Sequence, residues 1–310
     1  METLLQKAKR LGLWLGLKKL FGYEVAFSWG YRKRIPGREL YKEKGQEMPF
    51  TIVRNTSRYW YADPLICEYQ GKQVVFLECM DRKTNMGSIA TVALTGDSIY
   101  KKKPHQVIIE PFHMSFPMTF EWNGELYMLP ETEMINELVL YRCITFPWKW
   151  HRVGRFLEGH KVVDSAVIEM TEDEVTFLAS EYDPADPKLT RFVKFRFVRE
   201  NGEIKAEWIG GDTEEYTYES RLAGPIIDGE LCPIQRSTPA VYGYSTKFMK
   251  WTGSDFGEEL CEINPKMVPC QGIRSKLIGT HTYSATDEFE IIDVEFLVRK
   301  KKFKKKRYWK

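Results

Sequence analysis

Short alternating stretches of hydrophobic and polar residues run through most of the chain, and they predict β-strands. Residues 73–77, 125–129 and 174–178 are rich in β-branched and aromatic side chains, and each run follows a turn signal of Gly, Asn or Asp. A strand places alternate side chains on opposite faces, whereas a helix needs a period near 3.6. After residue 30, no helical pattern is longer than two turns. The body of the chain is therefore predicted to be one all-β unit.

The predicted strands fall into five repeats. Each repeat runs from a short opening segment into a hairpin, and the openings lie roughly 50 to 60 residues apart, about the length of a four-stranded propeller blade. The openings begin at Ala62, Phe116, Asp164, Ala223 and His281. The last repeat is too short for four strands, so residues 24–29 are expected to supply its missing strand and close the ring. This predicts a five-bladed β-propeller, in which the 14% of aromatic residues would fill the flat interfaces between sheets.

Residues 1–22 show a helical pattern instead, with two apolar stripes. One stripe contains Leu4, Ala8, Leu11 and Leu15, and the other contains Leu13, Leu17, Leu20 and Phe21. Trp14 and the neighbouring lysines are typical of a helix at a membrane surface, while packing against this protein or a partner is the alternative. The uncharged run 11–17 is much shorter than the roughly 20 residues of a membrane-spanning helix. No secretory signal peptide is expected either.

Charge is distributed unevenly along the chain. The formal charge is +3, yet residues 21–298 carry 32 basic and 42 acidic residues, and residues 299–310 carry nine basic residues and no acid. An acidic body argues against nucleic-acid binding. The Lys and Arg residues at both ends favour contact with an anionic membrane surface, with two solvated tails as the alternative. Three parts are thus predicted: an N-terminal helical segment 1–22, the propeller 23–298 and a basic C-terminal tail 299–310.

The cysteines, histidines and glycines exclude several kinds of site. Six cysteines form no C-x-x-C pair and five histidines form no H-E-x-x-H motif, so no metal site is expected. Loops of the G-x-G-x-x-G or G-x-x-x-x-G-K-[ST] type are absent from the sequence, and no cofactor is expected. Scattered cysteines in a chain of this length are typical of reduced thiols. The predicted location is the cytoplasm, including the inner face of the plasma membrane.

Several ionisable residues recur at equivalent points of the repeats, either close to a blade opening or at the end of the following strand. They are Asp63, Glu78, His113, Glu131, Asp164 and His281. The first strand of each propeller blade lines the axial channel, so these side chains are expected to converge on one pocket. Glycosyl chemistry needs one carboxyl group to move a proton and another to stabilise or attack the anomeric carbon. Arg236 and Tyr244 of the fourth repeat are further candidates for binding phosphate or sugar hydroxyls.

Each of these residues also has a purely structural interpretation. An Asp that precedes Pro, as Asp63 does, often caps a turn. Glu78 and Glu131 follow apolar strands, where a buried carboxylate needs a partner such as Arg221 or Arg236. A lone histidine is more often a hydrogen-bonded core residue than a ligand. Only convergence of the set on one pocket would favour the functional interpretation.

Distinctive motifs accompany the repeats. They are Trp60-Tyr61-Ala62-Asp63-Pro64, Phe76-Leu77-Glu78, the run 110–117 (EPFHMSFP), Pro130-Glu131-Thr132, Phe146-Pro147-Trp148, Asp164-Ser165, Tyr242-Gly243-Tyr244 and His281-Thr282-Tyr283. From about residue 60 to 285, these stretches resemble the propeller domain that precedes the glycosyltransferase domain of plant glucosamine inositolphosphorylceramide transferases, and its bacterial relatives in surface-polysaccharide loci. More distantly, the Ala-Asp-Pro opening and five blades resemble the propeller glycosidases of the arabinanase and β-xylosidase type.

The resemblance implies a carbohydrate-active enzyme, first of all a glycosyltransferase or related sugar-transferring enzyme of surface polysaccharide or glycolipid synthesis. A glycoside hydrolase and a non-catalytic carbohydrate-binding scaffold for a partner transferase are the alternatives. Asp63 would be the general base or nucleophile, with Asp164 or Glu131 as the acid. The glycosidases carry an Asp at the second blade opening, where this chain has Phe116-Pro117, so the hydrolase set is not reproduced. The residues expected to bind the sugar or glycolipid substrate are Glu78, His113, Arg236, Tyr244 and His281.

Overall fold

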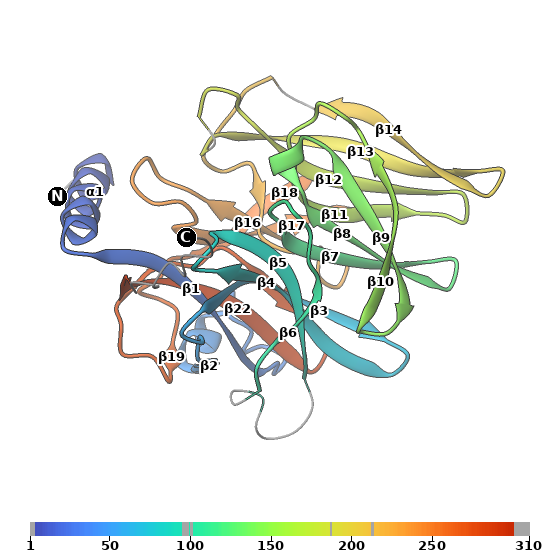
Figure 1. Ribbon diagram of the computed structural model, residues 1–310. Coiled ribbons are helices and arrows are strands. Elements are labelled where there is room, and N and C mark those ends of the chain that lie inside the picture. Colours follow the sequence, from blue (N-terminus) through green and yellow to red (C-terminus); the bar gives the residue numbers. More distant parts are fainter. Residues whose placement is uncertain (1–3, 95–98, 100–101, 187, 212–213, 301–310) are drawn as a thin grey trace, which may run out of the picture.

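Five β-sheets surround one axis and form a five-bladed propeller (Figure 1). The computed structural model describes residues 4–94, 99, 102–186, 188–211 and 214–300, and along residues 4–11 it describes the backbone alone. Four blades have four antiparallel strands, which follow one another in chain order across the sheet. The fifth sheet combines strands from both ends of the chain. The five-bladed all-β fold predicted from the repeats, with its short N-terminal helix, is confirmed.

The bounds of the elements follow the predicted repeats. Blade 1 contains β3 (Tyr59–Tyr69), β4 (Lys72–Asp81), β5 (Met86–Ala93) and β6 (His105–Ile108). Blade 2 contains β7 (Ser115–Trp122), β8 (Glu125–Glu131), β9 (Leu138–Thr145) and β10 (Lys149–Phe156). Blade 3 contains β11 (Val162–Met170), β12 (Glu174–Tyr182), β13 (Thr190–Glu200) and β14 (Glu203–Gly211). Blade 4 contains β15 (Arg221–Leu222), β16 (Leu231–Arg236), β17 (Ser245–Trp251) and β18 (Phe256–Ile263).

Blade 5 closes the ring with an N-terminal strand. Its strands are β20 (Leu277–Gly279), β21 (Tyr283–Ala285), β22 (Phe289–Arg299), β1 (Tyr23–Lys33), β2 (Phe50–Ile52) and β19 (Cys270–Gln271). β1 pairs with β22 in antiparallel register along its whole length, from Tyr23 opposite Arg299 to Lys33 opposite Phe289. The expected closure by residues 24–29 is therefore confirmed, and the closing strand is longer than expected. Closure covers the long edge of β22 that would otherwise be free to pair with another chain.

The innermost strands of blades 1, 2 and 3 carry the same irregularity. Their registers shift between Ala62 and Leu65, between Ser115 and Met118, and between Val163 and Ala166. Within each shift one residue has a left-handed backbone, with φ of 47° at Asp63, 42° at Phe116 and 42° at Asp164. A left-handed conformation costs a residue that has a side chain about 1 kcal/mol or more. Its recurrence at equivalent positions therefore shows that the three blades share one backbone geometry. Each bulge presents one side chain at the same point of its blade.

Aromatic side chains fill the interfaces between blades. Phe177 of blade 3 stacks on Phe195 with ring centroids 5.0 Å apart, and it meets Phe120 of blade 2 edge-on at 5.2 Å. All three rings are buried. Such contacts add to the free energy of burying apolar surface because the edge of one ring is attracted to the face of another. The interfaces hold the innermost strands at fixed distances from the axis.

The helix α1 (Leu4–Leu20) lies at the edge of the molecule, beside the start of β1 (Figure 1). Leu15 is buried against Val241 and Ile278, so the one member of the first predicted stripe whose side chain is described packs on this protein. Leu13 and Leu17, from the other stripe, are exposed. Among the described residues, no helix combines the length and apolar character needed to cross a bilayer. Most of the predicted basic tail, residues 301–310, lies outside the described residues.

Two short 3₁₀ helices complete the described elements. They cover Glu43–Glu47 and Glu133–Ile135. All six cysteines are free thiols.

Candidate functional site

Ionisable and tyrosine side chains from all five blades meet near the axis, and we call them the axial cluster. Its members are Asp63, Glu78, His113, Glu131, Asp164, Tyr182, Arg221, Tyr242, His281 and Asp293, linked by the contacts below. Six of the eight residues proposed as site residues from the sequence belong to it. Because their blade positions are equivalent, the propeller geometry brings them together from distant parts of the chain.

One half of the axial cluster is built around the His281 ion pair. His281 Nδ1 lies 2.6 Å from Asp293 Oδ2, and the other oxygen of Asp293 accepts the backbone N–H groups of His281 and Thr282, each at 3.0 Å. The Thr282 hydroxyl then donates to Asp63 Oδ1 at 3.0 Å. Asp63 Oδ2 accepts the backbone N–H of Phe116 at 3.2 Å, which ties blade 1 to blade 2. Asp63 is therefore held from two sides.

The other half is built around Arg221, which comes from blade 4. Its guanidinium donates to Asp164 and to the Tyr182 hydroxyl, and it donates to Glu131 at 2.8 Å. The same guanidinium lies over the rings of Tyr182 and Tyr242, at 5.0 and 5.1 Å from their centroids. The planar fork of Arg suits two carboxyl groups at once. Arg221 thus links blades 2, 3 and 4.

Glu78 and His113 form the third contact of the axial cluster. The backbone N–H of Gly87 donates to His113 Nδ1 at 3.0 Å, so this nitrogen accepts and the proton of the neutral ring is on Nε2. His113 Nε2 lies 3.5 Å from Glu78 Oε1, an oxygen that has no hydrogen bond otherwise. A side-chain carbon at Gly87 would lie within 2.7 Å of the His113 ring. Only glycine therefore allows this approach.

Burial and neighbouring charges shift the pKa values of the ionisable groups in the axial cluster in different directions. It raises the pKa of Asp63 to about 6 against the opposing charge of His281, and it raises the pKa of Glu78 and of Glu131 well above their usual range. Burial also lowers the pKa of His113. Burial alone would lower the pKa of His281, but the Asp293 carboxylate raises it to about 9. Burial thus favours the protonated forms of Glu78 and Glu131, while the Asp293 carboxylate favours the protonated form of His281.

The oxygen and nitrogen atoms of Asp63, His281 and Asp293 lie within 4.8 Å of one another, which is close enough for three ligands of one metal ion. A metal needs the neutral form of the imidazole. With the pKa of His281 raised to about 9, the imidazolium itself supplies the positive charge between the two carboxylates. A metal ion bound by these three side chains would therefore have to displace the proton of His281.

Solvent reaches the axial cluster on the side of Asp63 and His113. Their side chains are 14% and 29% exposed, whereas the side chains of Glu131 and Arg221 are 9% and 8% exposed. The arrangement places a carboxyl group with a pKa of about 6, two carboxyl groups with raised pKa values and an imidazole with a lowered pKa in one cluster.

Two of the residues proposed from the sequence lie elsewhere. Arg236 ends β16 and pairs with Glu219 and Glu262, each at 2.8 Å. Tyr244 packs against the small apolar group that receives Leu15 of α1. Both belong to the fourth repeat, but neither contacts the axial cluster.

The structure adds Asp293, Tyr182 and Tyr242 as members of the cluster. Asp293 lies within the apolar run Ile291-Ile292-Asp293-Val294, and an acid in the middle of a buried strand is the one signal that could have drawn attention to it. Tyr182 is the last residue of β12, and no distinguishing motif accompanies it. Tyr242 lies in a stretch quoted above for the resemblance, but only its contact with Arg221 reveals its place.

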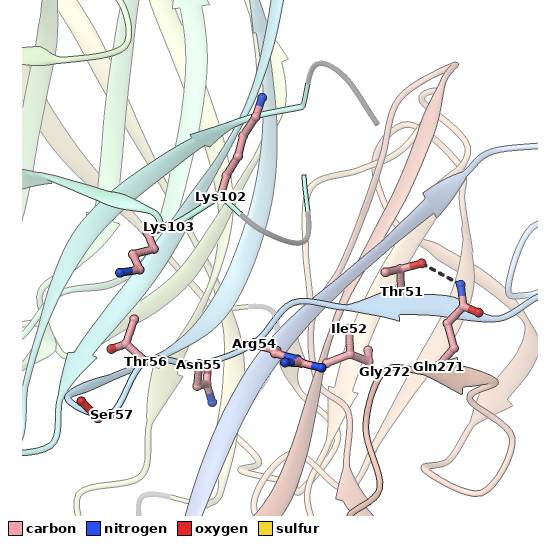
Figure 2. A pocket seen from close by; sticks show the side chains of 10 residues that line it. All are labelled: Thr51, Ile52, Arg54, Asn55, Thr56, Ser57, Lys102, Lys103, Gln271 and Gly272. Atoms are coloured by element: carbon pink, nitrogen blue, oxygen red, sulfur yellow. Dashed lines mark hydrogen bonds between the residues drawn. The ribbon is translucent and has the colours of Figure 1, made fainter. Parts of the chain in front are cut away.

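A separate cavity of 770 Å³ lies away from this cluster. It is lined by residues of β2 and the following loop, by Lys102 and Lys103, and by Gln271 and Gly272 (Figure 2). Thr51 and Gln271 are joined there by a hydrogen bond of 2.8 Å. None of the axial-cluster residues lines this cavity.

Comparisons with known proteins agree with the motifs and the fold. Residues 51–195 match the family described as "Glucosamine inositolphosphorylceramide transferase 1, N-terminal". The chain is 30% identical over 107 residues to glucosamine inositolphosphorylceramide transferase 1 of Arabidopsis thaliana, a match that covers 34% of this chain and 14% of the plant protein. The corresponding protein of Oryza sativa subsp. indica is 27% identical over 108 residues, which is 35% of this chain and 14% of the rice protein.

Two solved structures that share the fold are glycoside hydrolases. The catalytic domain of a GH62 α-L-arabinofuranosidase from Coprinopsis cinerea superposes with a TM-score of 0.51 at 10% identity, covering 86% of this chain and 97% of that one. A GH62 hydrolase in complex with xylotriose gives a TM-score of 0.52 at 10% identity, covering 79% and 95%. At this identity the likeness is one of fold alone. The chain spans only 14% of the length of the curated relatives it matches. Residues 51–195, which hold the axial carboxyl groups of blades 1 to 3, are thus similar to the glucosamine inositolphosphorylceramide transferase 1 N-terminal family, within a fold of five propeller blades.

Proposed function

We propose that this chain is a sugar-transferring enzyme that acts in the assembly of a cell-surface polysaccharide or glycolipid, with the axial cluster as its active site. The single observation that carries the proposal is that two carboxyl groups of the axial cluster differ in pKa. Asp63 has a pKa of about 6, and the pKa of Glu131 is raised well above its usual range. When the environments of two neighbouring groups push their pKa values apart, one group can act as a base and the other as an acid. The family match over residues 51–195 supports sugar transfer as the reaction.

The proposed step assigns a role to each group. Asp63 accepts the proton of an acceptor hydroxyl, whose oxygen bonds to the anomeric carbon while the bond from that carbon to the leaving oxygen breaks. Glu131, whose raised pKa favours the protonated form, gives its proton to the leaving oxygen. Asp164, in its ion pair with Arg221, holds the guanidinium in place beside Glu131. The step ends with the acceptor's proton on Asp63 and the proton of Glu131 on the leaving oxygen, and one proton exchanged with solvent at each carboxyl group restores the starting state.

The remaining members of the axial cluster bind the sugar or hold Asp63 in position. Glu78 and the Nε2–H of His113 stand beside the more exposed side of the cluster, where they would hydrogen-bond sugar hydroxyls. His281 is buried and acts through Asp293 and Thr282, which hold Asp63. His281 is therefore a positioning residue in this proposal.

Hydrolysis of the glycosidase kind fits the cluster less well. Phe116 has the same left-handed backbone as Asp63 and Asp164, at the equivalent bulge of blade 2, but it is apolar and buried. The carboxyl group that the glycosidases carry at the second blade opening therefore has no counterpart at this position.

A transfer assay with an Asp63 variant tests the proposal. The purified chain would be incubated with a panel of nucleotide-activated sugars and with inositol-phosphate lipids and oligosaccharides as acceptors, and products would be detected by mass spectrometry. Asp63→Asn keeps the size of the side chain, and Asn tolerates a left-handed backbone well. We expect the transfer rate to fall by about 100-fold or more, with a nearly unchanged melting temperature.

The exposed Asp287, in the turn between β21 and β22, provides the matched control. Asp287→Asn removes the same charge outside the axial cluster and should leave the transfer rate unchanged. Full activity of Asp63→Asn together with a lowered melting temperature would make Asp63 a turn residue and would contradict the proposal.

A non-catalytic carbohydrate-binding scaffold is the second candidate. The observation that favours it is the pairing of Arg221 with Asp164 and Glu131, which satisfies these carboxyl groups within the protein. Calorimetric titration with xylotriose and related oligosaccharides distinguishes the two. Binding that is lost in His113→Ala, with no transfer across the whole panel, would favour the scaffold.

The proposed location is the cytoplasm. Six free thiols support it, because a reducing compartment keeps such groups from forming disulfides. Labelling of intact and lysed cells with a membrane-impermeant reagent for an engineered surface cysteine would test the location. Labelling in intact cells would contradict it.

A further inference from the structure

We propose that the outward face of α1, together with the basic residues at its C-terminal end, is a docking surface for an anionic lipid bilayer. The surface consists of Leu13, Trp14, Leu17, Lys18, Lys19, Leu20, Phe21, Arg299 and Lys300, and we call it the α1 surface. This inference is independent of the sugar chemistry, since none of these residues belongs to the axial cluster.

Packing on the propeller fixes which face of α1 is turned outward. Leu15 is 8% exposed and lies against Val241 and Ile278. Gly12 lies so close to Ala240 that a side-chain carbon at Gly12 would come within 3.2 Å of the Ala240 Cβ. The helix is therefore held by its Gly12–Leu15 side. Its opposite side is left for solvent or for a partner.

That outward side is apolar. Leu13 is 69% exposed, Leu20 is 83% exposed and Phe21 is 77% exposed, and Trp14 and Leu17 are exposed as well. Leu13, Leu17 and Leu20 are spaced by four and three residues, so they form one stripe along the helix. Single exposed apolar side chains are ordinary on protein surfaces. Five of them between residues 13 and 21, on α1 and the residue that follows it, form a patch that favours an apolar partner.

Basic residues surround this patch. Lys18 Nζ lies 5.7 Å from the Trp14 ring centroid and 4.9 Å from that of Tyr23, and Lys19 is exposed beside it. In such a position a lysine lays its methylene groups along apolar surface and keeps its ammonium group in water. The same side chain can then reach lipid phosphates when the apolar stripe enters the bilayer interface.

The ring closure brings the other basic end of the chain to the same place. Tyr23 pairs with Arg299, and the backbone N–H of Lys300 donates to the carbonyl of Gly22 at 2.8 Å. Arg299 and Lys300 are exposed. Figure 1 shows α1 beside the start of β1, the strand whose first residue pairs with Arg299. Residues 301–310, seven of which are Lys or Arg, continue the chain from this point.

The combination of an apolar stripe and clustered positive charge favours a lipid surface over a protein groove. An interfacial helix needs apolar side chains to enter the acyl boundary and basic side chains to meet anionic headgroups. The body of the chain is acidic, with 32 basic against 42 acidic residues between positions 21 and 298. Repulsion between this acidic body and an anionic membrane would therefore orient the protein with the α1 surface toward the bilayer and the propeller away from it.

A vesicle sedimentation assay with the full chain tests the apolar part. The vesicles are phosphatidylcholine alone and an equimolar mixture of phosphatidylcholine and phosphatidylglycerol. We expect the unmodified chain to bind the mixed vesicles, and Leu13→Ser, Leu17→Ser and Leu20→Ser combined to reduce binding by about tenfold or more. The control removes three exposed apolar side chains elsewhere, by Ile109→Ser, Ile144→Ser and Ile209→Ser combined. It should bind as the unmodified chain does.

A second variant tests the electrostatic part. Lys18→Gln, Lys19→Gln, Arg299→Gln and Lys300→Gln combined should weaken binding to the mixed vesicles by about tenfold or more, and added salt should weaken binding of the unmodified chain. Equal binding to both kinds of vesicle would overturn the anionic preference. Failure of the unmodified chain to bind any vesicle would overturn the proposal. A dimer in solution that the triple Leu variant dissociates would also overturn it, because a second copy of the chain would then cover the α1 surface.

Discussion

Arg221 of blade 4 donates a hydrogen bond of 2.8 Å to Glu131 of blade 2, so it joins two blades that are not neighbours in the ring. The sequence separation of the two residues is 90. The same guanidinium binds Asp164 of blade 3. A single side chain therefore holds three blades together at the axis, at the point where the candidate acid lies.

Removal of Arg221 should destabilise the protein strongly. Arg221→Met leaves the buried carboxylate of Asp164 without its positive partner and Glu131 without its hydrogen-bond donor, and we expect the free energy of unfolding to fall by about 3–5 kcal/mol. Arg236→Met breaks an ion pair that is more exposed and should cost about 1 kcal/mol or less. Urea denaturation of both variants measures the difference. Equal losses would mean that the axial ion pairs contribute no more than surface ones.

Stability should fall as the pH rises through the pKa of His281. The folded-state pKa is about 9, above the ordinary value of 6.5, so the stabilisation is complete below pH 6.5 and is lost as the pH rises toward 9. The effect is on the order of 3 kcal/mol. The raised pKa values of Glu78 and Glu131 act in the same direction, because these groups also bind protons more tightly in the folded state.

The variant His281→Gln isolates the contribution of this residue. The difference between its unfolding free energy and that of the unmodified chain should shrink between pH 6.5 and 9. His151 is exposed on β10, and His151→Gln should leave the pH profile unchanged. A constant difference for His281→Gln across this range would show that its pKa is not raised by folding.

Deletion of residues 1–30 should destabilise the propeller far more than deletion of residues 1–20. The longer deletion removes most of β1, including the fully buried Ala26 and Trp29, and it exposes the edge of β22. Loss of Trp29 alone is worth about 3 kcal/mol or more. The shorter deletion removes α1, whose described packing rests mainly on Leu15. Thermal melting compares the two, and equal melting temperatures would contradict closure of the ring by β1.

The variant Gly87→Ala should disturb the axial cluster without adding charge. The new methyl group would lie 2.6 Å from the Met114 carbonyl oxygen and 2.9 Å from Glu78 Oε1, so the backbone or His113 has to move. We expect a loss of about 1–3 kcal/mol in unfolding free energy and a weaker affinity for sugar. Gly16 of α1 has no neighbouring atom within 4 Å, so Gly16→Ala should not lower stability. Unchanged sugar affinity in Gly87→Ala would exclude His113 from the binding site.

The sequence by itself determined the number of blades and the strand that closes the ring. Alternating strands, Asn-Gly or Asp-Gly turns and the spacing of the five openings are local properties, and each can be read within one repeat. The equivalent positions of Asp63, Asp164 and His281 followed from the same repeats. Their approach to one another required only that the blades be arranged around an axis.

Only the tertiary structure decided which charges meet. Both Arg221 and Arg236 were possible partners of Glu131, and ring closure brings Arg221 to it while Arg236 pairs with Glu219 and Glu262. Asp293 joins the site because its strand passes beside His281, and the two basic ends of the chain meet because β1 pairs with β22. Ion pairing and burial depend on distances between residues far apart in sequence, and these distances exist only once the five blades have packed.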